Sequence, residues 1–221
     1  MSAHDGRLLI IFYDEVPTTE AVSLALLDHT GISFAAFAKR DDHSEKAAMW
    51  TRDPLGFLPS GRLAIDADRE TIDALLTSPL ATTLGGVAYL CEGITPLMPQ
   101  LNVGERFSGT LQLCCFQRRT DINAVQLQQY WLEEHTGVAL STQNTLGYRQ
   151  NRVSRSGEPH FDGIVEEYFP PEASHSMEAF FADGDNETRM WEHIENLTKS
   201  SERFLDLDRS EVIHLSDTRI I

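Results

Sequence analysis

Two segments far apart in the chain, LLIIFY at residues 8–13 and LQLCCF at residues 111–116, are apolar at nearly every position. A strand with one face in solvent alternates apolar and polar side chains, whereas a strand buried on both faces does not. Each segment is therefore predicted to be a central strand with protein on both sides. Any fold for this chain has to cover both faces of two such strands.

The elements around these segments follow the same order twice: strand, helix, strand, strand, helix, strand. In the first half we expect strands at 8–15, 31–39, 61–66 and 86–94 and helices at about 18–29 and 68–84. In the second half we expect strands at 110–118, 147–153, 161–169 and 211–220 and helices at about 121–140 and 176–200. The order of elements repeats, although the residues hardly do.

A βαββαβ unit is the ferredoxin-like arrangement, whose antiparallel sheet carries helices on one face only. The other face of each sheet needs cover, and the two apolar strands indicate that the sheets cover each other. We therefore predict an α+β fold of two tandem ferredoxin-like βαββαβ units, residues 1–104 and 105–221. Their antiparallel sheets are expected to pack face to face as an intrachain pseudo-dimeric α/β barrel.

Residues 41–60 stand between two predicted strands and are long for a loop in a compact unit. Trp50, Phe57 and Leu58 make this segment more apolar than a solvated linker. One interpretation is a surface flap over a sheet edge or apolar patch. The other is a lid over a ligand site.

The formal net charge of −16 disfavours nucleic acid and anionic membranes as partners, because their phosphates would be repelled. A small hydrophobic or aromatic molecule fits better, and a homo-oligomer stays open. Cys91, Cys114 and Cys115 cannot all pair, and no CxxC motif or signal peptide is found, so we expect a cytoplasmic protein. The apolar run at 8–13 is too short to span a bilayer.

A tryptophan and a histidine lie one helical turn apart in the predicted helix at 121–140. Leu127, Trp131, His135 and Val138 fall at spacings of four, four and three residues, which places them on one stripe of an α-helix. A histidine on an apolar stripe is more often a satisfied core residue than a catalytic one. Its neighbours in the sequence change that balance.

The run YWLEEHTGVAL, the following GYRQNRV and FDGIVEEYF, and the closing FLDLDRSEVIHLSDTRII resemble the EthD family. The resemblance covers about residues 108–221 and depends on spaced residues: Tyr130, Trp131, His135, Tyr148, Asn151, Phe161, Asp162 and Gly163. Members of this family are small ferredoxin-like proteins that pair into a dimeric α/β barrel. Where the family usually has a proline after the histidine, this chain has Thr136, Gly137 and Val138.

The resemblance implies one principal pocket, between the helices and the sheet of the second half. Trp131 and Tyr148 would form its walls, and Asn151 would offer a donor and an acceptor to a substrate. His135 would carry a proton, and Asp162 would orient it, titrate itself, or bind nearby backbone as a structural carboxylate. The first half keeps the element order but offers only His29 in the corresponding helix, so it is interpreted as a degenerate copy.

Two kinds of function fit these residues. The first, which the resemblance to the EthD family implies, is a cofactor-independent enzyme of oxidoreductase or dehydratase and isomerase type, in which His135 transfers protons on a small aromatic or hydrophobic carbonyl compound. The second is a non-catalytic binding or accessory protein, with haem held by His135 as a minor variant. We expect no metal and no cofactor, since the histidine spacings match no standard metal motif and no phosphate-binding glycine loop is present.

Other groups of polar residues are weaker candidates for a site. Glu166 and Glu167 are adjacent in a predicted strand and should face opposite sides, so they cannot form a working carboxylate pair. No GxSxG motif is present, and Cys114 and Cys115 lie within an apolar strand, so a nucleophile is not indicated.

Overall fold

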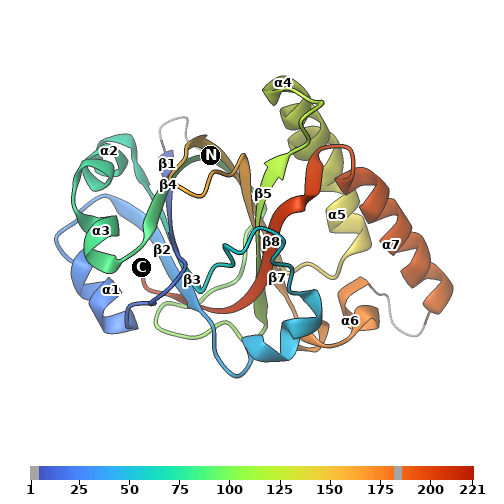
Figure 1. Cartoon of the computed structure of the whole chain (residues 1–221). Helices are drawn as coiled ribbons and strands as arrows, with labels where there is room; N and C mark the ends of the chain where they lie inside the picture. Colours follow the sequence, from blue (N-terminus) through green and yellow to red (C-terminus); the bar gives the residue numbers. More distant parts are fainter. Residues whose placement is uncertain (1–4, 182–185) are drawn as a thin grey trace.

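The computed structural model describes residues 5–181 and 186–221, and within them the strands form one closed antiparallel barrel (Figure 1). The order around the barrel is β1-β3-β2-β8-β5-β7-β6-β4. The strands are β1 (Asp5–Phe12), β2 (Ile32–Lys39), β3 (Gly61–Asp68), β4 (Val87–Leu97), β5 (Thr110–Arg118), β6 (Gly147–Arg155), β7 (Gly163–Phe169) and β8 (Leu205–Arg219).

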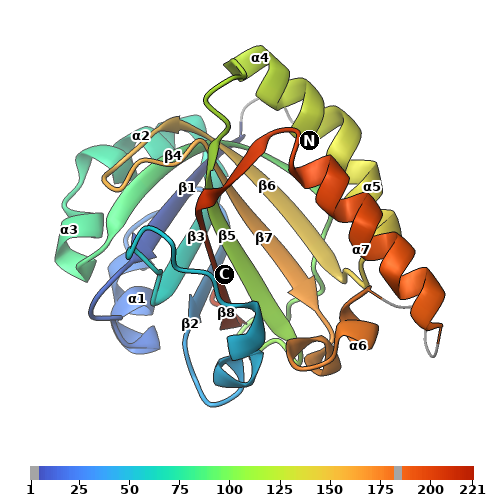
Figure 2. The same ribbon diagram turned by 45° about the vertical axis from the view of Figure 1, so that its right-hand side comes forward.

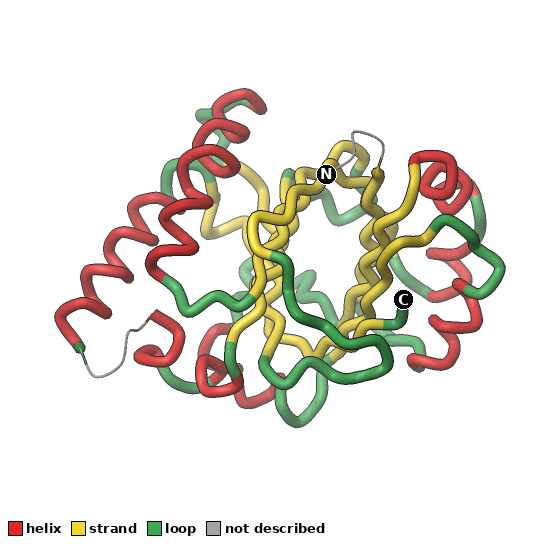
Figure 3. The backbone as a smooth tube through the Cα atoms, turned by 180° about the vertical axis from the view of Figure 1, so that it is seen from behind, coloured by secondary structure: helices red, strands yellow, loops and turns green. Residues whose placement is uncertain are grey.

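The helices lie outside the barrel in two groups, on opposite sides (Figures 1 and 3). The first group is α1 (Thr19–Leu26), α2 (Arg69–Thr77) and α3 (Leu80–Leu84). The second is α4 (Ala124–Leu127), η2 (Gln128–His135), α5 (Thr136–Thr142), α6 (Met177–Phe181) and α7 (Glu187–Ser201), with short 3₁₀ turns at η1 (Ser44–Trp50) and η3 (Pro171–Ser174). No helix in the described ranges is long and apolar enough to cross a membrane.

The predicted α+β barrel is confirmed, and the structure adds how it closes. Strands of the first half lie in the order β4-β1-β3-β2, and strands of the second half repeat that order as β8-β5-β7-β6. The two sets also pair with each other along their edges, through β2 with β8 and β4 with β6. The sheets therefore do not merely stack face to face, because backbone hydrogen bonds join them at two seams.

Most element boundaries differ from the expected ones for local reasons. The helix expected at 68–84 is divided at Ser78 and Pro79, because a residue before proline is pushed into extended backbone; Ser78 has ψ of 163°. β8 begins at Leu205, earlier than expected, and β4 continues to Leu97. The helix expected at 176–200 is seen as α6 and α7, and the residues between them at 182–185 lie outside the described part of the chain.

The two apolar strands are buried on both faces, as predicted. On β1, Leu9 and Ile11 point into the barrel, while Leu8, Ile10 and Phe12 contact the helices of the first group. On β5, Leu111, Leu113 and Cys115 point inward and Phe116 contacts the second group. Because side chains alternate along each strand, one set packs in the cluster inside the barrel and the other set packs between the sheet and the helices outside it.

A network of charged side chains shares the barrel interior with these apolar residues. Arg62 on β3 is fully buried and forms ion pairs with Glu166 on β7 at 2.8 Å and with Asp217 on β8 at 3.0 Å. Arg149 on β6 pairs with Glu166 at 3.1 Å and with Asp66 on β3 at 2.9 Å. Each arginine therefore links a strand of one half to a strand of the other.

Burial by itself would raise the pKa of Glu166, but the positive charges of Arg62 and Arg149 lower it to about 2. Glu166 is therefore ionised in the folded protein at neutral pH. A buried ion of this kind is stable only while its partners are present, since removing one partner leaves an uncompensated charge.

Residues 41–60 cross from the first half to the outside of the second half (Figure 2). Leu55 and Leu58 pack against the barrel cluster, which fits a flap over an apolar patch. Trp50, in contrast, contacts Phe180 in the second group of helices. The segment therefore both covers the barrel and reaches a helix of the other half.

We expect Glu166→Gln to lower the free energy of unfolding by roughly 3–5 kcal/mol, because it leaves two buried guanidinium groups undercompensated. Urea denaturation at pH 7 measures this change. The matched control is Glu133→Gln on the exposed side of η2, which should change stability by no more than about 0.5 kcal/mol. A loss below about 1 kcal/mol for Glu166→Gln would show that the network relaxes without its carboxylate.

Candidate functional site

The helix that carries Trp131 and His135 is not a regular α-helix. Its middle turns, η2, have the π conformation, in which each turn holds more residues than in an α-helix. The buried positions therefore recur every four residues at Leu127, Trp131, His135 and Ala139. Ala139 continues the stripe where the α-helical spacing predicted Val138.

The π turn leaves a backbone carbonyl that the surrounding side chains satisfy. The Thr136 hydroxyl donates to the carbonyls of Trp131 at 3.4 Å and Leu132 at 2.9 Å, and the Gln150 amide also donates to Trp131 at 3.4 Å. Thr136 and Gln150 are themselves joined by a hydrogen bond of 3.0 Å. Thr136 stands near the position at which members of the EthD family usually have a proline, and in this chain its hydroxyl contacts the carbonyls of the π turn.

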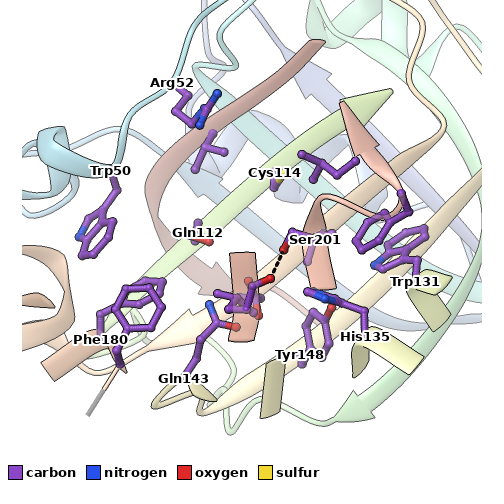
Figure 4. Close-up of a pocket in the computed structure, with 17 residues that line it drawn as sticks. Trp50, Arg52, Gln112, Cys114, Trp131, His135, Gln143, Tyr148, Phe180 and Ser201 are labelled. Carbon is purple, nitrogen blue, oxygen red and sulfur yellow. Dashed lines mark hydrogen bonds between the residues drawn. The ribbon is translucent and has the colours of Figure 1, made fainter. Parts of the chain in front are cut away.

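A cavity of about 230 Å³ lies between this helix, α6, α7 and the outer face of the sheet (Figure 4). Its walls include six aromatic side chains: Trp50, Trp131, Tyr148, Phe180, Phe181 and Phe204. The cavity also exposes a few polar groups, among them Gln112, His135, Gln143 and Glu167. An apolar chamber with few polar groups is the usual character of a small-molecule site.

Four polar residues form a row across the sheet beneath this cavity. The strand register places His214 on β8 beside Gln112 on β5, Gln112 beside Glu167 on β7, and Glu167 beside Tyr148 on β6. All four side chains are on the outer face of the sheet, because side chains alternate along a strand. Gln112 and His214 are joined by a hydrogen bond of 3.2 Å.

Glu167 is the most unusual group in the row. Its side chain is buried, and its Oε1 atom has no hydrogen-bond partner among the described atoms. Burial raises the pKa of Glu167 to about 8, while the neighbouring Gln143 opposes part of this shift. Glu167 is therefore mostly protonated at pH 7, and a modest change around pH 8 converts it from a proton donor to a proton acceptor.

His135 lines the same cavity but differs in its proton affinity. Its Nδ1 forms a hydrogen bond of 2.9 Å with the Ser200 hydroxyl on α7, and its ring packs edge-on against Phe204. Burial lowers the pKa of His135 to about 4. The imidazole is thus neutral at pH 7 and is a weaker proton acceptor than an unperturbed histidine.

The other predicted site residues separate into two groups. Trp131 and Tyr148 line the cavity together with His135. Asn151 does not, because it stands three residues from Tyr148 on β6 and so faces the barrel interior. There its amide donates to Glu166 at 3.0 Å and its Oδ1 accepts from Arg7 at 2.7 Å, so its placement as a substrate-binding residue is corrected.

Asp162 is also outside the cavity. Its Oδ2 accepts from the Arg118 backbone amide at 2.9 Å, and its carboxylate pairs with the Arg118 guanidinium. This is the structural alternative, a carboxylate bound to nearby backbone just before β7. The His135 imidazole is held by Ser200 instead.

The sequence predicts three of the residues that line the cavity, Trp131, His135 and Tyr148, and Glu167 and Trp50 are two important ones that it does not. Glu167 was set aside as half of an unworkable pair with Glu166; their opposite orientation is confirmed, and it is this orientation that isolates Glu167 at the cavity. The period of two along β7 placed Glu167 on the same face as Val165, which also lines the cavity. Trp50 comes from residues 41–60, and no local pattern predicts which distant surface that segment reaches.

The first half has a cavity near His29, but its chemistry differs. It lies at the end of α1 and is bordered by Leu26, Leu27 and Ile32, with no Asp, Glu, Phe, Tyr or Trp side chain in its lining. His29 is therefore not placed as His135 is.

Haem does not fit the cavity of the second half. A volume of about 230 Å³ is below the roughly 300 Å³ at which pockets for drug-sized ligands begin, and a porphyrin is larger than most such ligands. In the parts of the chain that are described, no group of three His, Cys, Asp or Glu side chains converges as metal ligands.

Comparison with known proteins shows the fold. No protein-family model and no curated protein matches the chain. Among solved structures, an anthrone oxidase-like protein aligns over 98% of this chain and 93% of its own, with a TM-score of 0.57 and 7% identity. A proposed monooxygenase from Fusobacterium nucleatum subsp. nucleatum aligns over 98% and 94%, with a TM-score of 0.50 and 9% identity.

At these identities the similarity concerns architecture alone. The chain has the fold of the dimeric α/β barrels, and the EthD family itself is not singled out.

Proposed function

We propose that this protein is a cofactor-independent enzyme that transfers a proton on a small, mostly apolar carbonyl compound, with Glu167 as the proton carrier. The observation that carries the proposal is a buried carboxyl, at the floor of an aromatic-walled cavity, whose Oε1 atom has no hydrogen-bond partner in the described part of the chain. Strongly shifted groups inside clefts are a recurrent property of catalytic sites. A carboxyl that titrates near the working pH suits general acid–base chemistry.

The dimensions and lining of the cavity support a ligand of one or two rings. A cavity of ~150 Å³ in another protein binds benzene, and this cavity measures about 230 Å³. Its tryptophan and phenylalanine rings favour a flat ligand, since aromatic pairs attract through stacked and edge-on contacts. A single neutral polar group on that ligand could reach the Glu167, Gln112 and Tyr148 row.

The residues present account for both halves of a proton transfer. In its ionised form Glu167 takes a proton from the carbon next to the carbonyl, and the electron pair of that C–H bond moves to the carbonyl oxygen. Burial raises the pKa of Tyr148 well above its usual value, so its hydroxyl keeps its proton and can donate to that oxygen. Neutral His135 offers a second hydrogen bond in the same cavity.

We further propose that the chain is a tandem fusion of two ferredoxin-like units, 1–104 and 105–221, with an EthD-like second unit. The repeated strand order β4-β1-β3-β2 and β8-β5-β7-β6 supports this.

An electron-rich enolate can itself reduce oxygen. The names of two structural neighbours, an anthrone oxidase-like protein and a monooxygenase, suggest oxidation reactions for those proteins. Oxidation of the enolate by O₂ is therefore the reaction we favour after proton removal. The electron pair of the enolate forms a bond from the carbon to one oxygen atom, O₂ is reduced to the peroxide level, and the outer oxygen takes up the proton held by Glu167 to give a hydroperoxide.

A non-catalytic binding protein is the second candidate. The observation in its favour is that Glu167 and His135 are both largely neutral at pH 7, which suits the holding of a neutral ligand as well as chemistry. The two candidates differ in whether a bound carbonyl compound exchanges its protons.

The proton carrier can be tested with 2-tetralone, a two-ring ketone whose exchange of hydrogen for deuterium next to the carbonyl is followed by NMR. If Glu167 is the base, the enzyme-catalysed rate rises with pH and levels off above about pH 8, because only the ionised form accepts a proton. If His135 is the base, the rate is already level above about pH 4. We expect the first profile.

Variants separate the roles of the two residues. Glu167→Gln should lower the exchange rate about 10²-fold or more, whereas His135→Gln should lower it by less than about tenfold. Glu133→Gln, the same change at an exposed site, should have no effect. Wild-type exchange in Glu167→Gln would remove Glu167 as the carrier, and binding without any exchange would favour the binding protein.

The protonation state of Glu167 has its own consequence for stability. A carboxyl whose pKa is about 8 when folded and 4.5 when unfolded favours the folded state fully below pH 4.5 and loses that advantage as the pH rises through 8. Between pH 7 and pH 9 the wild type should lose about 1.4 kcal/mol relative to Glu167→Gln. Urea denaturation of the wild type and of Glu167→Gln at pH 7 and at pH 9 measures this change. If the two proteins differ in stability by the same amount at both pH values, the pKa of Glu167 in the folded protein does not lie near 8.

A further inference from the structure

A short strap from the first half forms one wall of the cavity in the second half. We use strap for residues 50–55, within the connection between β2 and β3. Arg52 pairs with Val212 on β8 through two backbone hydrogen bonds of 3.0 and 2.9 Å. The backbone amide of Leu55 donates to Glu211 on β8 at 3.0 Å. The strap is therefore fixed to β8 at two points, and the first of them, Arg52 with Val212, is part of the cavity wall.

Trp50, at the start of the strap, is held from two sides. Its ring stacks on Phe180 with centroids 4.4 Å apart and planes inclined by 27°. Its indole Nε1 donates to the Ala173 carbonyl in η3 at 2.9 Å. Stacking fixes the plane of the ring and the hydrogen bond fixes its rotation, so the indole stands as a rigid wall.

The strap supplies the cavity with residues that the second half does not encode. Trp50 and Arg52 line the cavity, and every other lining residue belongs to the segment from 112 to 212. Figure 4 shows Trp50 beside Phe180 on one side of the cavity, with Trp131 and His135 on the other. The distance between these two sides limits how long a bound ligand can be.

We infer that Trp50 determines the length of the ligand that the second-half cavity accepts, so that the first half of the chain sets the specificity of a site in the second. The inference rests on the proposed function in that it takes this cavity as the ligand site. The ligand class follows from the walls: neutral aromatic alcohols and ketones of two fused rings fit, and longer molecules meet the indole.

The chemistry of tryptophan offers a matched pair of variants. Trp50→Ala removes the ring and extends the cavity toward Phe180. Trp50→Phe keeps an aromatic ring for the Phe180 stack but loses the Nε1 donor to Ala173. If the aromatic ring at position 50 sets the longest ligand that binds, only Trp50→Ala changes that length. If the hydrogen bond to Ala173 sets it, both variants change it.

Isothermal titration calorimetry with 2-naphthol and the longer 4-phenylphenol tests the inference. The wild type should bind 2-naphthol about tenfold or more tighter than 4-phenylphenol, because the rigid indole of Trp50 excludes the terminal phenyl ring of 4-phenylphenol. Trp50→Ala should abolish or reverse this preference, and Trp50→Phe should keep it within about threefold. Near-UV circular dichroism tests whether each variant is folded. If Trp50→Ala is not folded, Trp50→Leu is measured in its place.

The outcomes are distinct from those for the proposed function. An unchanged ratio of affinities in folded Trp50→Ala or Trp50→Leu overturns the role of Trp50, even where 2-tetralone exchange is normal. A lost preference in folded Trp50→Phe overturns the wall and assigns selection to the hydrogen bond. Failure of the wild type to bind either alcohol overturns the ligand class, whereas altered selectivity without any 2-tetralone exchange supports Trp50 in a binding protein.

Discussion

The ion pairs inside the barrel are the constraint on which the rest of this structure depends. Arg62 and Arg149 are buried where water cannot solvate them, and removing such ions from water costs several kcal/mol each. Their partners Asp66, Glu166 and Asp217 come from β3, β7 and β8, and Arg7 on β1 also pairs with Asp66. The three positive and three negative charges are therefore balanced only when both halves are in place. The network thus selects one register of the closed barrel, while the apolar cluster around it supplies most of the favourable burial.

The same closure creates two different environments on adjacent residues of β7. Glu166 points inward, meets two guanidinium groups and has a pKa of about 2. Glu167 points outward, meets aromatic rings and amides, and has a pKa of about 8. The sheet separates them, because the period of two sends neighbouring side chains to opposite faces. The candidate reactive carboxyl is therefore the one that the arginines of the interior do not reach.

The sequence predicted the parts of this arrangement that depend on local pattern. The doubled element order, the two fully buried strands and the shared stripe of Trp131 and His135 follow from periodicity. The spacing of three residues between Tyr148 and Asn151 also places their side chains on opposite faces of β6, whereas the resemblance to the EthD family implied that both line the pocket. The π turn and the reach of Trp50 could not be predicted, since both depend on contacts with residues far away in the chain, Gln150 for the first and Phe180 for the second.

The two halves differ in how completely the space between their helices and the outer face of their sheet is filled. The first half packs α1, α2 and α3 against β1 and β3 with apolar side chains such as Leu26 and Ile72, so its outer face is a stabilising core. The second half leaves part of the corresponding surface open as the aromatic cavity, which lacks the burial that a filled core would provide. The strap offsets part of that loss by covering the cavity from outside. The proton carrier that we propose needs such an unfilled place, and the filled core of the first half and the apolar cluster inside the barrel give the fold the stability to contain one.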